Sequence, residues 1–293
     1  MKNKIKCRYC KSSNFVKQGF RKTENRGKIQ KYYCKECRKY FTQDNGFYRM
    51  RTDPKTITLS IDMYLSNLSS RKMRNQLKRH FKIKRSHQTI LNWIYKYVLK
   101  VHNYVDSLGY NLGEKFYADE TMINREGNYD RFWACIDWST RMITGTHYSL
   151  NGNLEEAKVF IKKAVSKGKP KFIQTDSAQF YPKAFRKLFY TTKLGVKGGL
   201  IIEHKVQNVR RTRIHNYRIE TVFSKLKDRI NSFRGLKAIW SAPIILIGLV
   251  IQHNFIEEHT TTQAHPCELA GQRLDLGEDR WLGLIKLASE KNE

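Results

Sequence analysis

This sequence of 293 residues lacks long apolar runs. The longest one, residues 244–251, is far shorter than the roughly 20 residues that a helix needs to cross a bilayer. The lysines near the N-terminus are not followed by the apolar core of a signal peptide. We therefore expect a cytoplasmic protein that has no membrane partner.

The sequence is also poor in acidic residues, with 26 Asp and Glu against 56 Lys and Arg, which gives a formal net charge of +30. Residues 1–110 hold +21 of this charge, because they contain 27 basic and only 6 acidic side chains. The alternative is a merely soluble basic surface, but a solvated face is normally of mixed sign. The charge density favours neutralisation of nucleic-acid phosphates, so we expect a DNA-binding protein associated with the nucleoid.

Six cysteines in a reducing compartment are expected to be thiols or metal ligands. Four of them form two CxxC pairs separated by 23 residues, a spacing typical of a zinc ribbon that holds one structural Zn²⁺ within residues 1–50. The alternative is four incidental thiols. Cys135 and Cys267 have no such partner and are expected to be ordinary residues of the core and tail. The proposed ligands are Cys7, Cys10, Cys34 and Cys37.

Residues 51–110 contain apolar side chains at helical spacing in three successive stretches. Ser86 follows a basic turn and is a candidate N-cap for the third helix. Three short helices of this kind are typical of a helix-turn-helix domain, although helical hairpins without a DNA-binding role are also common. In a chain this basic, we expect the third helix to face a DNA groove. The side chains it would offer are His87, Gln88, Asn92 and Lys96.

Residues 111–259 alternate between strand and helix patterns. Strands are expected over residues 115–119, 131–137, 141–149, 171–176 and 199–206, and helices over 154–166, 178–189 and from about 216. This β-β-β-α-β-α-β-α order is that of the ribonuclease H-like fold, in the α/β class. A final apolar helix is expected over residues 244–258. Residues 260–293 are left as a C-terminal tail of unknown role.

Three acidic residues stand out in this region. Two apolar runs each end on an aspartate, Asp119 and Asp176, and Glu220 lies inside the last long helical pattern of the domain. Carboxylates converging from rigid elements are the ligands that Mg²⁺ or Mn²⁺ prefers. Such an arrangement predicts a site for two divalent cations.

Each acid has an alternative. Glu120 neighbours Asp119, and strand alternation puts them on opposite faces, so only one of the two is expected to face the metals. Asp176 could be a plain helix N-cap. Glu203 and Asp228 are the rivals of Glu220. A polar stripe favours the last of these, because it is followed at helical spacing by Ser224, Lys227 and Asn231.

Three blocks of this region resemble a known family. They are Tyr117-Ala-Asp-Glu-Thr121, Thr175-Asp-Ser-Ala-Gln-Phe-Tyr181 and Asn216-Tyr-Arg-Ile-Glu220, the last followed by Lys227. They resemble the D, D and E blocks of insertion-sequence DDE transposases, in particular the archaeal type of the insertion sequence six family. The resemblance covers residues 112–258. The 44-residue interval from Asp176 to Glu220 is longer than is usual in that family, and residues 261–293 match nothing in it.

The resemblance implies a metal-dependent polynucleotidyl transferase. Its substrates would be the terminal inverted repeats of the element and a target, both double-stranded DNA, and it would act as a homo-oligomer, at least a dimer. Asp119, Asp176 and Glu220 would be the catalytic metal ligands for hydrolysis and strand transfer. The alternatives are a nuclease or resolvase on the same scaffold, and an inactive transposase-derived regulator. Further DNA contacts are expected from Arg210, Arg211, Arg213 and Lys227.

Overall fold

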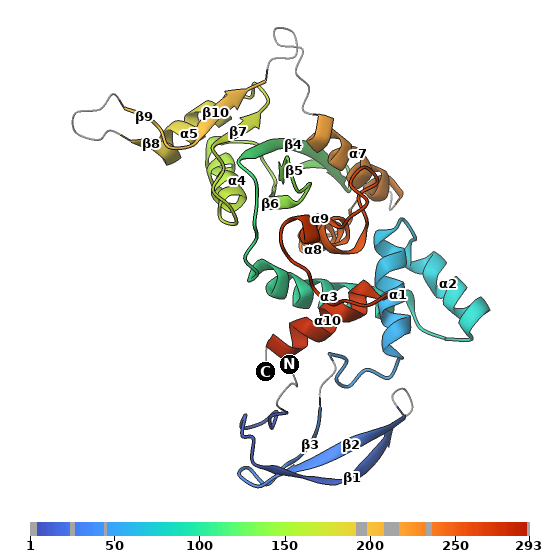
Figure 1. Ribbon diagram of the computed structural model, residues 1–293. Coiled ribbons are helices and arrows are strands. Elements are labelled where there is room, and N and C mark those ends of the chain that lie inside the picture. Colours follow the sequence, from blue (N-terminus) through green and yellow to red (C-terminus); the bar gives the residue numbers. More distant parts are fainter. Residues whose placement is uncertain are drawn as a thin grey trace. The chain divides into compact units, whose positions relative to one another are not determined.

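The computed structural model describes residues 5–23, 27–43, 46–191, 198–207, 217–232 and 236–291. The chain divides into two compact units (Figure 1). The first contains Met1–Tyr64, Ser70–Ser107 and Asp275–Glu293, and the second contains Leu65–Ser69 and Leu108–Leu274. None of the helices in these ranges is both long and apolar enough to span a membrane.

The first unit begins with a three-stranded antiparallel sheet of β1 (Phe15–Thr23), β2 (Gly27–Cys34) and β3 (Tyr40–Thr42). Its small core is aromatic: the Tyr32 and Phe41 rings stack with centroids 5.3 Å apart, and Phe15 meets both edge-on. So few apolar side chains cannot stabilise a fold of this size by burial alone. The sheet therefore needs a further source of stability, such as a metal.

Four helices complete this unit: α1 (Pro54–Leu65), α2 (Ser70–Phe81), α3 (His87–Asp106) and α10 (Arg280–Lys291). The predicted cap of the third helix is confirmed, because the Ser86 side chain accepts a hydrogen bond from the Thr89 backbone N–H. Helix α10 packs against α3 and buries Trp281 and Leu284. The end of the expected tail is thus an ordered part of the helical unit.

The second unit contains a five-stranded sheet in the order β10-β7-β4-β5-β6. Strand β5 is antiparallel to both of its neighbours, β4 and the edge strand β6. Strand β7 runs parallel to both β4 and β10. This is the predicted ribonuclease H-like arrangement, and it is confirmed. The strands are β4 (Lys115–Arg125), β5 (Asn128–Asp137), β6 (Ile143–Ser149), β7 (Phe172–Thr175) and β10 (Glu203–Val206).

Two strand predictions are corrected. The strand expected over residues 199–206 is divided, because its first part, β9 (Gly199–Leu200), pairs with β8 (Tyr190–Thr191), while β10 pairs with β7. The first strand was expected to end at Asp119 but continues to Arg125, because all of its later residues pair with β5. Asp119 therefore lies in the middle of β4.

Helices cover both faces of the sheet. On one face, α4 (Leu154–Val165) and α5 (Phe180–Phe189) pack against Phe116 and Ala118. The opposite face carries Tyr117 and Asp119, and α7 (Tyr217–Ser232) contacts β4 and β5 there. The apolar stripe predicted for α7 is confirmed, since its members are at most 5% exposed: Ile219, Val222, Phe223, Leu226 and Ile230.

The remaining helices follow α7 in the same unit. They are α8 (Ala242–Ile251), a π-helical turn η1 (Gln252–Ile256) and α9 (Pro266–Leu269). The Asn254 side chain both accepts from the Ile143 backbone N–H and donates to its carbonyl, at 2.9 Å each. This pair of hydrogen bonds fixes η1 to the start of β6.

Candidate active site and metal centres

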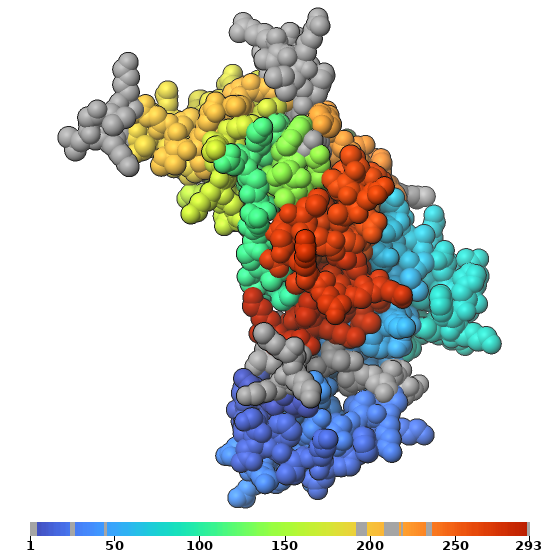
Figure 2. Space-filling view, viewed as in Figure 1, coloured from blue at the N-terminus to red at the C-terminus, as the bar shows by residue number. Residues whose placement is uncertain are grey.

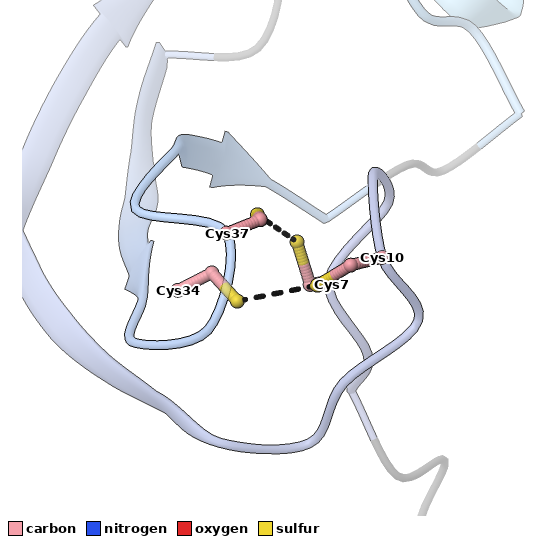
Figure 3. Close-up of side chains that lie close together, drawn as sticks. All are labelled: Cys7, Cys10, Cys34 and Cys37. Carbon is pink, nitrogen blue, oxygen red and sulfur yellow. Dashed lines mark hydrogen bonds between the residues drawn. The ribbon is translucent and has the colours of Figure 1, made fainter.

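The four cysteines predicted as zinc ligands lie together. The Sγ atoms of Cys7 and Cys37 are 3.6 Å apart, and those of Cys10 and Cys34 are 3.5 Å apart (Figure 3). One sulfur from each residue lies within 4.8 Å of the other three. A tetrahedral Zn²⁺ with Zn–S bonds of about 2.3 Å would separate its sulfurs by about 3.8 Å. The cluster therefore fits a zinc ribbon.

The protonation tendencies differ among the thiols of the cluster. Burial disfavours the Cys7 thiolate, but hydrogen bonds from the backbone of Cys10 and Tyr9 and from neighbouring thiols outweigh it and lower the pKa of Cys7 to about 7. Burial and the neighbouring thiols raise the pKa of Cys37 to about 12. A thiolate is the form that binds zinc. The turn that holds Cys7 therefore prepares one ligand before any ion arrives.

A second candidate metal centre lies where β4 passes the end of β7. Carboxylate oxygens of Asp119, Glu120 and Asp176 lie within 4.8 Å of one another. Asp119 and Glu120 were expected to start from opposite faces of β4, and Glu120 does bond to Tyr181 of α5, on the face of Phe116. Both carboxylates nevertheless approach Asp176, and the expectation that only Asp119 binds the metals stays a prediction. Strand β7 pairs with β4 only as far as Tyr117. Beyond that residue, no strand within the described ranges pairs with β4 on this side, so both acids can reach Asp176.

Glu120 has a partner on each oxygen. Arg131 Nη1 donates to its Oε1 at 3.1 Å, and the Tyr181 hydroxyl donates to its Oε2 at 2.7 Å. Gly152 makes room for the arginine, since a Cβ there would lie 2.2 Å from Arg131 Nε. Asp119 Oδ1 accepts only a local backbone bond, from the Glu120 N–H at 2.8 Å. Of the two neighbours, Asp119 has more capacity for a metal ion.

Asp176 follows the last residue of β7 and is exposed. Its Oδ1 accepts from the Ala178 N–H at 3.1 Å, which orients the carboxylate locally. The alternative reading as the cap of the next helix does not hold, because α5 begins at Phe180 and its N-cap residue is Gln179. Asp176 is therefore available to the centre as an exposed acid.

Glu220 lies in the exposed first turn of α7. It is not among the acids whose oxygens approach within 4.8 Å, but its charge is one of those that raise the pKa of Asp119. The start of α7 is held over this face by aromatic contacts. The Trp138 ring lies 4.8 Å from that of Tyr117 and 5.8 Å from that of Tyr217. Glu220 thus borders the cluster from a separate element.

The charge of the cluster is unbalanced. Burial, followed by the charges of Asp176, Glu120 and Glu220, raises the pKa of Asp119 to about 7. Burial also raises the pKa of Glu120. Acids this close repel one another unless a cation lies between them. A hard divalent cation, which takes oxygen ligands, fits this donor set.

This repulsion predicts an unusual stability effect. Between its ordinary value of 3.8 and about 7, folded Asp119 holds a proton that the unfolded chain has lost, so stability falls as pH rises through this window. We expect Asp119→Asn to remove the penalty and stabilise the metal-free protein by about 2–4 kcal/mol at pH 8. The gain should shrink towards pH 4. Urea unfolding with a chelator measures it.

An exposed acid of α7 serves as the control for that experiment. Asp228→Asn should change the free energy of unfolding by no more than about 0.5 kcal/mol at either pH. An Asp119→Asn variant that is less stable than the wild type at pH 8 would show that the acid is not strained by its neighbours.

Some supporting residues were not predicted. His204 Nε2 lies 2.9 Å from Thr175 Oγ1, which donates to the Asp176 carbonyl, and its ring stacks on Phe185 with centroids 4.2 Å apart. Burial lowers the pKa of His204 to about 4, so this link is uncharged at neutral pH. It ties β10 to the residue that precedes Asp176. Tyr181 ends the sequence block that begins at Thr175, but nothing in the sequence predicted its hydrogen bond to Glu120.

The predicted DNA-binding residues fall into two groups. Gln88, Asn92 and Lys96 are exposed along one side of α3, where Gln88 Nε2 donates to Asn92 Oδ1 at 3.1 Å, and His87 at the start of that helix is partly buried. Lys227 is exposed on α7. The other three, Arg210, Arg211 and Arg213, lie outside the described residues.

The family model described as a DDE domain matches residues 113–259, just over half of the chain. No curated protein matches. The HTLV-2 integrase catalytic core domain in complex with magnesium, in trimeric form, is 13% identical, with a TM-score of 0.39, and the match covers 56% of this chain and 99% of that chain. A simian T-cell lymphotropic virus intasome in complex with PP2A regulatory subunit B56 gamma is 15% identical, with a TM-score of 0.38, and the match covers 67% of each chain. The family of this chain follows from the match to residues 113–259.

Proposed function

Because this chain belongs to the insertion-sequence DDE transposase family, we propose that Asp119, Asp176 and Glu220 are its catalytic metal ligands. The observation that carries the proposal is the approach of the Asp119 and Asp176 oxygens to within 4.8 Å at the end of β7. Glu220, at the border of this cluster, is the third ligand of the proposal. Two Mg²⁺ or Mn²⁺ ions would bind these acids.

Bound divalent cations would supply Lewis-acid activation and stabilise the entering and leaving oxygens of a phosphodiester. The protein positions the carboxylates that would bind these cations. Strand pairing on β5 fixes Asp119, and the Thr175–His204 contact supports Asp176. Arg131 and Tyr181 give each oxygen of Glu120 a hydrogen-bond partner without a metal. We propose that the reaction hydrolyses a phosphodiester at each element end, and that the exposed 3′-hydroxyl then attacks target DNA.

The first 110 residues supply the DNA recognition in this proposal. They carry +21 and contain the cysteine cluster and helices α1–α3, which we propose act as a zinc ribbon and a helix-turn-helix domain. Helix α2 adds a dense basic surface with Arg71, Lys72, Arg74, Lys78 and Arg79. We further propose a homo-oligomer on the terminal repeats, acting at the nucleoid.

The test of the function is incubation of the full chain with labelled element-end DNA, target DNA and Mg²⁺. A transposase forms strand-transfer products in which an element 3′ end is joined to the target. A nuclease or resolvase on this scaffold would cleave without these products. Binding without any metal-dependent cleavage would identify a DNA-binding regulator.

The exposed amides of α3 predict sequence reading. Gln88 and Asn92 lie one helical turn apart, and amide side chains can pair with adenine edges in a major groove. Gln88→Ala and Asn92→Ala should each weaken binding to the terminal repeat by about 1–3 kcal/mol and change binding to random DNA little. Fluorescence anisotropy with both duplexes measures this.

Lys96, one turn further along α3, is the matched comparison. Lys96→Gln should weaken binding to both duplexes alike and reduce the salt dependence by roughly one unit. If Gln88→Ala and Asn92→Ala also weaken binding to both duplexes equally, α3 does not recognise the DNA sequence. The zinc ribbon then becomes the better candidate for sequence recognition.

A further inference from the structure

The second unit contains a pocket of about 290 Å³ that the proposed reaction leaves without a role. Residues of α7, of the loop after β5, of η1 and of the turn that follows it line this pocket. Figure 2 shows the light-orange atoms of α7 beside the red-orange residues that come later in the same unit. The volume is close to the lower end of small-ligand pockets, about 300 Å³, and exceeds what a single water or simple ion needs.

Most of the pocket surface is apolar, with Ile136 and Val222 among its lining residues, and its polar side chains are basic or hydroxylic. These polar side chains include Arg141, Lys225, His253 and His259, together with threonines 221, 260 and 261. The nearest acids are already engaged. Glu257 pairs with Arg229, and Asp137 accepts hydrogen bonds from Ser139 and Thr140. Arg141 Nη1 donates to the Trp138 carbonyl, and its other N–H groups, the exposed Lys225 and several hydroxyl groups form a set of donors suited to an anion.

His259 adds an independent observation. Its Nδ1 is buried and has no hydrogen-bond partner. Its backbone is used elsewhere, because its carbonyl accepts from the N–H groups of Thr262 and Gln263 and its N–H donates to the Ala264 carbonyl. These backbone hydrogen bonds fix the turn that carries His259 beside the pocket. An unpaired buried nitrogen is costly, so a ligand that satisfies it gains free energy.

The histidines are uncharged at neutral pH. Burial lowers the pKa of His253 to about 4, and burial together with the charges of Arg141 and Lys225 lowers that of His259. His253 Nε2 also hydrogen-bonds the Arg141 carbonyl at 2.9 Å, which stabilises the loop that carries the guanidinium. The attraction for an anion therefore comes from Arg141 and Lys225, and the imidazole of His259 offers a neutral hydrogen bond.

The pocket lies on the same face of the sheet as Asp119. Ile136, which lines it, pairs with Tyr117, and Tyr117 points to the same face as Asp119, two residues further along β4. Two residues along a strand span roughly 7 Å. The pocket and the acids therefore occupy neighbouring parts of one face of the sheet.

We propose that this pocket binds a backbone phosphodiester of the DNA strand that lies across the Asp119 face, held by Arg141, Lys225 and His259. The assignment of DNA as the ligand rests on the proposed function, whereas the affinity of the pocket for phosphate does not depend on it. It acts as a positioning site, because a held neighbouring phosphate fixes where the scissile bond lies relative to the carboxylates.

The first test uses the metal-free full chain and inorganic phosphate at constant ionic strength. The imidazole resonance of His259, identified by its loss in His259→Gln, should shift and saturate with phosphate. Lys225→Gln, an exposed position, should weaken this affinity about tenfold or more. Lys162→Gln, an exposed lysine of α4 outside the pocket, should leave it unchanged. Absence of a saturable shift in the wild type would overturn the proposal, whether or not the protein cuts DNA.

The second test separates DNA from free phosphate. Binding of an element-end duplex should lose roughly one unit of salt dependence in Lys225→Gln and none in Lys162→Gln, because one phosphate contact is removed. A phosphate-dependent shift at His259 with an unchanged salt dependence would show a site for free phosphate alone and overturn the assignment to DNA.

Discussion

Asp119→Asn and Asp176→Asn should each reduce metal-dependent strand transfer by about a thousandfold, and Glu220→Gln should do the same. Each change keeps the size of the side chain and removes an anionic oxygen ligand, and the loss of one ligand to a catalytic metal costs several kcal/mol of transition-state stabilisation. Binding of the terminal repeat should be preserved, since the proposed DNA-reading elements lie within residues 1–110. Rates under single-turnover conditions, with binding measured separately, test this.

The rival acids are the matched controls. Glu203→Gln and Asp228→Asn also remove exposed acids, and we expect rates within about twofold of the wild type. Retained activity in Asp119→Asn, together with its loss in Glu120→Gln, would transfer the ligand role to Glu120. Activity lost in Glu203→Gln and retained in Glu220→Gln would instead move the third ligand from α7 to β10.

Cys34→Ser should release the zinc and unfold the ribbon. The cluster holds four sulfurs within 4.8 Å, and the sheet around it has only a small aromatic core. Structural zinc contributes on the order of 10–16 kcal/mol in comparable peptides, far more than this core can replace. We expect one zinc per chain in the wild type, none in the variant, and loss of amide protection across β1–β3.

Cys135→Ala is the control, because this thiol is fully buried in the second unit among apolar residues. That variant should retain one zinc per chain and the amide protection of β1–β3, although the core of the second unit would be less stable. Stoichiometric zinc in Cys34→Ser would refute the ligand assignment.

Local patterns in the sequence predicted those features that local physics determines. Period-two alternation placed Asp119 with Tyr117, and the 3.6-residue period identified the buried stripe of α7. The convergence of Glu120 with Asp119 and Asp176 depends instead on where β7 stops pairing with β4, after Tyr117. The length of a strand pairing is a tertiary property, so alternation along β4 alone did not predict that both carboxylates approach Asp176.

The phosphate pocket and helix α10 show the same limit. Arg141, Lys225 and His259 are far apart in the chain, and no short motif connects them. They meet at one pocket because η1 is fixed to β6 through Asn254 and α7 contacts β5. Similarly, residues 260–293 were left as a tail of unknown role, because helix α3, against which α10 packs, ends at residue 106, far away in sequence.

The measurement that tests the central claim most directly is strand transfer by the full chain on DNA that carries the repeats flanking its gene. With Mg²⁺ or Mn²⁺, we expect products in which the element's 3′-hydroxyl is joined to a target phosphate. Asp119→Asn should give none while binding the same DNA. Tight binding of the repeats by the wild type with neither cleavage nor joining at any metal concentration would contradict the account.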